Sequence, residues 1–98
     1  EVLNYIEDNL SKSITIEELS QIVHFHPNYF IRFFRDHVGC SPIQYINGMR
    51  IDKAKNLLRT TFLSIKEITD LTGFNDPSYF SKHFKKNVGL SPLEYRNG

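Results

Sequence analysis

The chain has 98 residues, enough for one domain or for two very small ones. Its twelve Lys and Arg residues nearly balance eleven Asp and Glu residues, and 40% of its residues are hydrophobic, which excludes a disordered polyelectrolyte. No apolar run approaches the roughly 18 residues of a membrane span, and the single cysteine, Cys40, excludes an internal disulfide and a cysteine-rich zinc site.

The chain opens without a methionine, inside a helical pattern, and shows no signal peptide. We therefore expect a domain excised from a longer protein. One cysteine fits a reducing compartment, so a cytoplasmic location is expected, with no membrane partner.

The near-neutral total hides an uneven distribution of charge. Residues 1–49 carry three basic and six acidic side chains, a net charge of −3, whereas residues 50–98 carry nine and five, a net charge of +4. A polyanion is therefore expected to feel the second half more strongly. Two ordinary solvated faces are the alternative explanation.

An internal repeat organises the chain. The segment HPNYFIRFFRDHVGCSPIQYI (26–46) aligns with DPSYFSKHFKKNVGLSPLEYR (76–96), with nine of 21 positions identical. Upstream the offset falls from 50 residues to 49, which places one extra residue of the second copy near Asn75 and Asp76. Two copies of one helical unit are predicted.

Helix start and stop signals recur in both copies, in chain order. Thr15 and Ser64 each precede a Glu by three residues, the spacing of a capping box, and Ile14 and Leu63 before them fit a hydrophobic staple. All four prolines suit the first position of a helix, and Gly39 and Gly89 suit helix ends. The pattern predicts an all-α fold with seven helices, near 2–11, 16–23, 27–37, 42–58, 65–72, 77–87 and 92–96.

Apolar faces give a first list of core residues. In the first helix we expect Val2 or Leu3 to be buried, together with Ile6 and Leu10. The fourth helix, roughly 25 Å long at about 1.5 Å per residue, is long enough to join two subdomains. Its predicted apolar side consists of Ile43, Ile46, Ala54, Leu57 and Leu58.

Each copy has the spacing of a helix-turn-helix, with its turn at His24 or at Gly73. On the second helix of each pair, aromatic and aliphatic residues share one side: Phe30, Phe33, Phe34 and Val38 in the first copy, and Phe80, Phe84 and Val88 in the second. Polar and basic residues share the other side: Asn28, Ile31, Arg32 and Arg35, and Ser78, Ser81, Lys82 and Lys85. Such a face suits a helix that enters the DNA major groove.

Plainer interpretations stand beside this one. The phenylalanines are core residues rather than platforms for stacked bases, and the basic side chains alone would fit an ordinary wet surface. A helical module that binds a protein partner, with weak or no specific DNA binding, is the alternative function. The two differ in that only DNA binding requires a steeply salt-dependent affinity for a duplex.

The segments Gly73-Phe74, 76–82, Phe84-Lys85 and 89–96, with the 49–58 linker pattern, resemble the DNA-binding domain of the AraC/XylS family of bacterial transcription regulators. The resemblance covers nearly the whole chain. It implies seven helices in two helix-turn-helix subdomains, 1–41 and 60–98, joined by a long linker helix, 42–59.

The resemblance also implies a function. The family's domains bind double-stranded DNA specifically, with both recognition helices (27–37 and 77–87) in successive major grooves of a site of roughly 20 bp, and usually activate transcription. Expected partners are RNA polymerase, an effector or receiver domain in the rest of the chain, and a second copy through that part. The location implied is the nucleoid, and no cofactor is implied.

Roles follow position by position. The implied base readers are Asn28, Ile31, Arg32, Ser78, Ser81 and Lys82. The implied phosphate contacts are Arg35, Arg50, Lys85 and Arg96, and the helix N-termini at Thr15 and Ser64. By donor chemistry Arg32 suits guanine and Asn28 suits adenine, while Ile31 suits a thymine methyl group.

Some positions depart from the family pattern. Gly48 lies inside the linker helix where a longer, often basic side chain is common, and Asp36 is acidic where a basic residue is common. Pro27 and Pro77 hold places that some relatives use for DNA contact. With a pI near 8.1, these features predict modest affinity, with the second half as the anchor and with dimerisation adding affinity.

No enzymatic signature is present, so no catalytic residue is predicted. The four histidines, His24, His26, His37 and His83, have no metal-ligand spacing, and no metal site is expected. Cys40 follows a helix-ending glycine and is expected to be a small apolar contact rather than a nucleophile.

Overall fold

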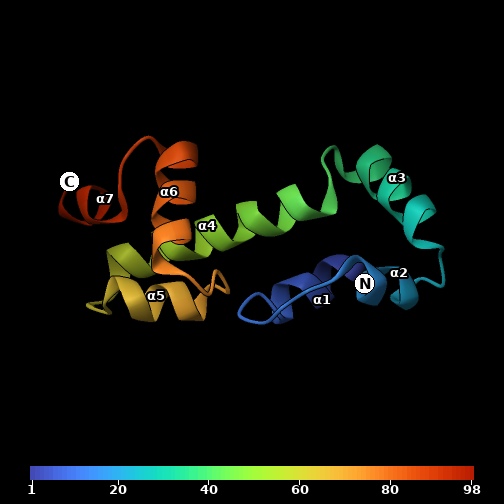
Figure 1. Ribbon diagram of the computed structural model, residues 1–98, viewed down its shortest axis with the longest axis horizontal. Helices are drawn as coiled ribbons and strands as arrows, with labels where there is room; N and C mark the ends of the chain where they lie inside the picture. The colour runs from blue at the N-terminus through green and yellow to red at the C-terminus, as the bar shows by residue number, and fades with distance from the viewer. The chain divides into compact units, whose positions relative to one another are not determined.

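The computed structural model describes all residues, Glu1–Gly98, and contains seven α-helices and no strand (Figure 1). The predicted all-α fold is confirmed, and every helix boundary lies within three residues of its expected place. None of the helices is both long and apolar enough to cross a membrane. The helices are α1 (Val2–Asp8), α2 (Ile16–Ile22), α3 (Pro27–Val38), α4 (Pro42–Thr60), α5 (Ile65–Leu71), α6 (Pro77–Val88) and α7 (Pro92–Asn97).

The chain divides into two compact units, Glu1–Met49 and Arg50–Gly98. The division falls inside α4, which begins in the first unit and ends in the second. The two units are also the two halves with net charges of −3 and +4. The units therefore differ in charge by seven, although they repeat one helical pattern.

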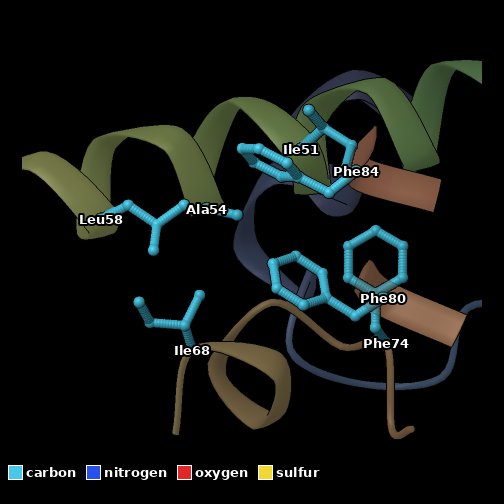
Figure 2. Packing of buried hydrophobic residues seen from close by; sticks show 7 residues of the cluster. All are labelled: Ile51, Ala54, Leu58, Ile68, Phe74, Phe80 and Phe84. Atoms are coloured by element: carbon cyan, nitrogen blue, oxygen red, sulfur yellow. The ribbon is translucent and has the colours of Figure 1, made fainter. Parts of the chain in front are cut away.

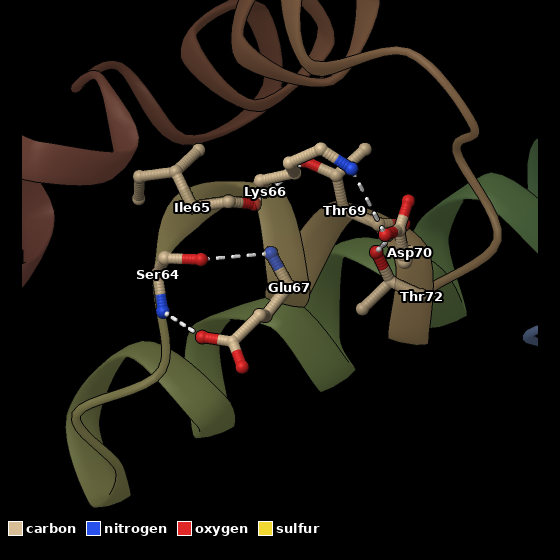
Figure 3. A network of polar contacts seen from close by, with 7 residues as sticks. All are labelled: Ser64, Ile65, Lys66, Glu67, Thr69, Asp70 and Thr72. Atoms are coloured by element: carbon tan, nitrogen blue, oxygen red, sulfur yellow. Dashed lines mark hydrogen bonds and ion pairs between the residues drawn. The ribbon is translucent and has the colours of Figure 1, made fainter.

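Capping boxes start α2, α5 and α7. In α2 and α5 the N-cap hydroxyl accepts from the backbone N–H three residues on, and the Glu there accepts from the N-cap N–H. Figure 3 shows the second case, with Ser64 and Glu67 joined by bonds of 3.0 and 2.8 Å. At α4 the same reciprocal pair joins Ser41 to Gln44, a residue without a titratable proton.

The capping boxes make stability depend on acid. Hydrogen bonds from Ser64 hold the pKa of Glu67 below its ordinary value. A folded-state pKa below the unfolded one means that the stabilisation is complete above the unfolded pKa and is lost as the pH falls through the folded pKa. We expect Glu67→Gln, which keeps the cap but cannot titrate, to lose less stability than the wild type between about pH 5 and pH 3.

Urea unfolding of both proteins at several pH values measures this difference. Glu18 and Glu94 titrate in both proteins. Their contribution therefore cancels when the loss of stability of the variant is subtracted from that of the wild type, and the remainder is the contribution of Glu67. Parallel decline of the two stabilities with falling pH would contradict the assignment.

The turns adopt the expected left-handed conformations. His24 and Gly73, the predicted turn residues, have φ of 58° and 81°, and Gly39 and Gly89 end α3 and α6 with φ of 99° and 92°. The extra residue of the second copy, Asn75, also has a positive φ, 67°. Asparagine tolerates this conformation, so the insertion is absorbed without altering the start of α6.

The second unit has one buried hydrophobic core, which holds α6 in place. Figure 2 shows side chains from α4 facing side chains from α5, α6 and the turn between them. Phe80 and Phe84 are fully buried in it, as the inward face of α6 predicts, and Val88 packs against its edge. The buried members are Ile51, Ala54, Leu58, Ile68, Phe74, Phe80 and Phe84.

The first unit has a matching core, and it corrects several sequence assignments. Its buried members are Ile6, Leu10, Leu19, Phe30, Phe34 and Ile46. Val2, not Leu3, packs against this core. Ile43 and Val38, expected inside, are 53% and 36% exposed, because they lie at the edges of their helices' apolar faces. Phe33 is only half-buried.

The first helix is also shorter than expected. It ends at Asp8, because Asn9 leaves the helical conformation and its side-chain amide donates to the Tyr5 carbonyl at 2.8 Å. Leu10 is still buried, but from the turn that follows the helix rather than from the helix itself.

Candidate nucleic-acid interface

The outward face of α3 is accessible. Asn28, Arg32 and Arg35 are exposed and Ile31 is half-buried, while Phe30 and Phe34 on the opposite side are buried. Neither arginine forms an ion pair within the chain, so both guanidinium groups remain available to an external anion. The face combines a fork-shaped donor, an amide and an apolar side chain, which suits readout of base edges.

The outward face of α6 repeats this arrangement with different chemistry. Ser78, Lys82 and Lys85 are exposed, and Ser81 is half-buried. Hydroxyl groups and flexible ammonium groups discriminate among bases less sharply than arginine and asparagine do. The helix carries more cations than α3, because Lys86 adds to Lys85 in the last turn.

The same aromatic anchors hold both helices. In the first unit the rings of Phe30 and Phe34 lie 5.8 Å apart, and Tyr45 meets Phe34 edge-on at 5.7 Å. In the second unit the Phe80 and Phe84 rings lie 5.7 Å apart, and Tyr95 meets Phe84 edge-on at 5.5 Å. The two units therefore share the packing that positions α3 and α6, while the outward residues of these helices differ.

α3 also carries an aromatic row that was not predicted from the sequence. Phe25 meets Tyr29 and Phe33 edge-on at 4.9 and 5.1 Å, and His37 lies 4.1 Å from Phe33. This row explains why Phe33 is outside the core. The spacing of four residues from Phe25 through His37 was the available signal.

The second unit has a shorter version of this row. Tyr79 stacks on His83 with ring centroids 5.7 Å apart, and Phe74 lies 5.6 Å from the same imidazole. Burial, with a smaller contribution from the charge of Lys86, lowers the pKa of His83. His83 is therefore held toward its neutral form beside the basic end of α6.

Four of the predicted phosphate contacts have partners within the protein. The Arg96 guanidinium donates from Nε to the Leu58 carbonyl at 3.1 Å and from Nη2 to the Thr61 carbonyl at 3.3 Å. Arg50 is half-buried, and that burial lowers the pKa of its guanidinium. The N-termini at Thr15 and Ser64 each hold a capping carboxylate. These four positions are tied to the fold, whereas Arg35 and Lys85 project from exposed helix faces.

The positions that depart from the family pattern have clear local settings. Pro27 and Pro77 occupy the first turns of α3 and α6, where their missing N–H is not needed. A Cβ added at Gly48 would meet nothing within 4 Å, so a longer side chain fits there. Asp36 is exposed on α3, next to Arg35 in sequence.

No group of three or more His, Cys, Asp or Glu side chains is placed to hold a metal ion. Cys40 is half-buried. Two hollows, one within each unit, have volumes of about 230 and 220 Å³. The first is almost entirely apolar, between the start of α1 and the end of α3, and the second lies at the end of α4 beside Arg96.

Comparison with known proteins agrees with this arrangement. The profile of a helix-turn-helix domain family matches residues 19–98. The HTH-type transcriptional regulator YobQ of Bacillus subtilis is 34% identical over 72 residues, which is 74% of this chain and 30% of that protein. The chain thus spans less than a third of the length of the curated relatives it matches.

Solved structures match the fold over nearly the whole chain. The C-terminal domain of AraT, a response regulator from Geobacillus stearothermophilus, is 34% identical with a TM-score of 0.93, covering 98% of this chain and 80% of that one. The DNA-binding domain of AdpA, a global transcriptional factor solved in complex with a target DNA, is 29% identical with a TM-score of 0.93, covering 98% and 86%. The chain therefore belongs to the AraC/XylS-type family of helix-turn-helix DNA-binding domains.

Proposed function

We propose that this chain binds double-stranded DNA sequence-specifically, as the DNA-binding part of a transcription regulator. The observation that carries the proposal is a surface that occurs in both units. Each unit has an exposed polar and basic face on the second helix of its helix-turn-helix, and an equivalent pair of buried phenylalanines anchors that helix. A relative by fold, AdpA, was solved on a target DNA.

Base readout is assigned to six residues on two helices. On α3, Arg32 reads guanine with its two-pronged donor, Asn28 reads adenine, and Ile31 contacts a thymine methyl group. On α6, Ser78, Ser81 and Lys82 hold the equivalent places. The two helices enter successive major grooves, which lie about 34 Å apart, on a site of roughly 20 bp.

The backbone contacts are assigned by exposure and charge. Arg35 and Lys85 are the foremost phosphate contacts, because both are basic and exposed. Arg50 and the helix starts at Thr15 and Ser64 remain candidates that must first release or share their internal partners, whereas the guanidinium of Arg96 already donates to two backbone carbonyls. The positive second unit supplies most of the attraction to DNA.

Further parts of the proposal concern the whole regulator. Activation of transcription through contact with RNA polymerase is proposed from the family resemblance, in the cytoplasm at the nucleoid. An effector or receiver domain elsewhere in the regulator supplies the signal and pairs two copies. AraT, a response regulator with a similar C-terminal domain, favours the receiver.

Selection from a random pool of duplexes at about 100 mM salt tests the proposal. Enrichment of two short half-sites about 10 bp apart is expected, one for each recognition helix. Enrichment of a single half-site would restrict readout to one unit. Absence of any enrichment at low and moderate salt would contradict the proposal and favour a protein-interaction module.

Lys85→Ala is expected to weaken binding to every duplex alike and to reduce the slope of log affinity against log salt by about one. The physical reason is that an ammonium group bound to a phosphate releases one counterion from the DNA and contacts no base. Fluorescence anisotropy over a range of salt concentrations measures the slope. A changed sequence preference with an unchanged slope would instead make Lys85 a base reader.

A further inference from the structure

The last helix, α7, is tied to the end of α4 by one side chain. The guanidinium of Arg96 bonds two backbone carbonyls, of Leu58 and Thr61, which lie 38 and 35 residues away in sequence. Both carbonyls are at or just beyond the last turn of α4, where they lack helical partners. Arg96 thus works as a C-terminal cap supplied by a distant helix.

A neighbouring contact strengthens the same junction. The Arg59 guanidinium lies over the Tyr95 ring, 5.1 Å from its centroid. The hydroxyl of Tyr95 is buried without a hydrogen-bond partner, so ring contacts rather than a hydrogen bond orient the side chain. Any loosening of α7 therefore frees the Tyr95 ring directly.

Tyr95 connects this junction to the recognition helix. Its ring meets Phe84 of α6 edge-on, with centroids 5.5 Å apart, and Phe84 is fully buried in the core. The contacts run from α4 through Arg96 and Tyr95 to Phe84. Lys85, on the outward side of α6, is the next residue in the chain.

α7 needs such an anchor because it is short. A helix of six residues is not stable alone, and its own support is a capping box between Ser91 and Glu94. In the first unit the equivalent segment needs no such anchor. Ile46, which aligns with Arg96, is buried in the core, and its helix continues to Thr60.

We propose that Arg96 is a positioning residue for DNA readout by α6, rather than a phosphate contact. By fixing α7 to the end of α4, it holds Tyr95 against Phe84 and so sets the place of α6. The inference rests on the proposed function for its DNA readout, but the clasp itself is testable without DNA.

The test compares Arg96→Ala and Arg96→Lys with a matched control, Lys53→Ala. Lys53 also donates to a helix-ending carbonyl, that of Leu71 at 3.2 Å, and its removal also deletes one positive charge. Its hydrogen-bond partner Leu71 belongs to α5, so the bond that is lost does not join α4 to α7. DNA affinity is measured across salt concentrations at a temperature where circular dichroism shows every variant to be folded, and amide hydrogen exchange is measured on the free 98-residue protein.

The proposal predicts a specific pattern. Arg96→Ala should weaken duplex binding about tenfold, because α6 is held less firmly for readout, with an unchanged salt slope because no phosphate contact is lost. Arg96→Lys should not restore binding, because one ammonium group cannot replace the two-pronged donor. Exchange should accelerate in α7 and α6 in both variants, and in neither helix in Lys53→Ala.

Two results would overturn the proposal. One is a salt slope lower by about one in Arg96→Ala, restored by lysine, with unchanged exchange in α7, which is the behaviour of a phosphate contact. The other is faster exchange with unchanged DNA affinity, which limits Arg96 to stability. If the wild-type protein selects no duplex, the proposed function fails, while exchange in α6 still decides whether the clasp exists.

Discussion

Phe84→Ala is expected to destabilise the second unit by about 3–5 kcal/mol. Phe84 is fully buried, and its ring contacts both Phe80 and Tyr95. Removing the ring leaves a cavity in the buried core of the second unit, beside Phe80 and Tyr95. Small domains have stabilities of about 0.05–0.15 kcal/mol per residue, so the loss is comparable with the whole stability of the unit Arg50–Gly98.

Phe62→Ala provides a matched control for this substitution. Phe62, between α4 and α5, has an exposed fraction of 105%, so the same change of residue type removes no packing there. Its effect is expected to stay within about 0.5 kcal/mol. Chemical unfolding, followed by circular dichroism and by hydrogen exchange in α6, measures both variants. Equal stability of the two variants would mean that Phe84 does not anchor α6.

Local signals in the sequence were sufficient for the helices. Capping boxes at Thr15 and Ser64, prolines at helix starts and glycines at helix ends act within a few residues, so their spacing alone predicts them. The repeat added an independent check, because the same signals recur at an offset of 49 or 50 residues. The left-handed turns at His24 and Gly73 were predictable for the same reason.

Edges of the core were not predictable in the same way. A helical pattern shows which side of a helix is apolar, but not how far the neighbouring element reaches along it. Ile43 and Val38 lie on the apolar sides of their helices, but no neighbouring element covers them fully, and they are exposed. Phe33 fits an apolar face as well, yet it packs beside Phe25 and His37 in a row at the surface.

Long-range polar contacts were the other gap. The sequence makes Arg96 a basic residue in a family motif, and a phosphate role follows from charge alone. Its two carbonyl partners lie 35 or more residues away and are backbone groups, which leave no mark on the sequence. Arg50 is similar, since its half-buried setting is decided by the fold. In contrast, exposure of Arg32 and Lys82 followed directly from the helical spacing.

Arg32→Ala is expected to weaken binding to the selected duplex by about 1–3 kcal/mol and to relax the sequence preference at one base pair. Arg32 is the best base reader in the chain, because its side chain is exposed on α3, forms no internal ion pair and can donate two parallel bonds to guanine. Binding to the selected duplex and to single-base variants of it measures affinity and preference together.

Arg35→Ala is the control, because it removes the same side chain from the next turn of the same face. A phosphate contact predicts that this variant loses affinity for all duplexes equally and lowers the salt slope, while its preference stays intact. The contrast matters because the first unit carries a net charge of −3, so its binding cannot rest on general attraction to DNA. If Arg32→Ala changed neither affinity nor preference, Arg32 would not read a base, and the assignment of base readout on α3 would be wrong.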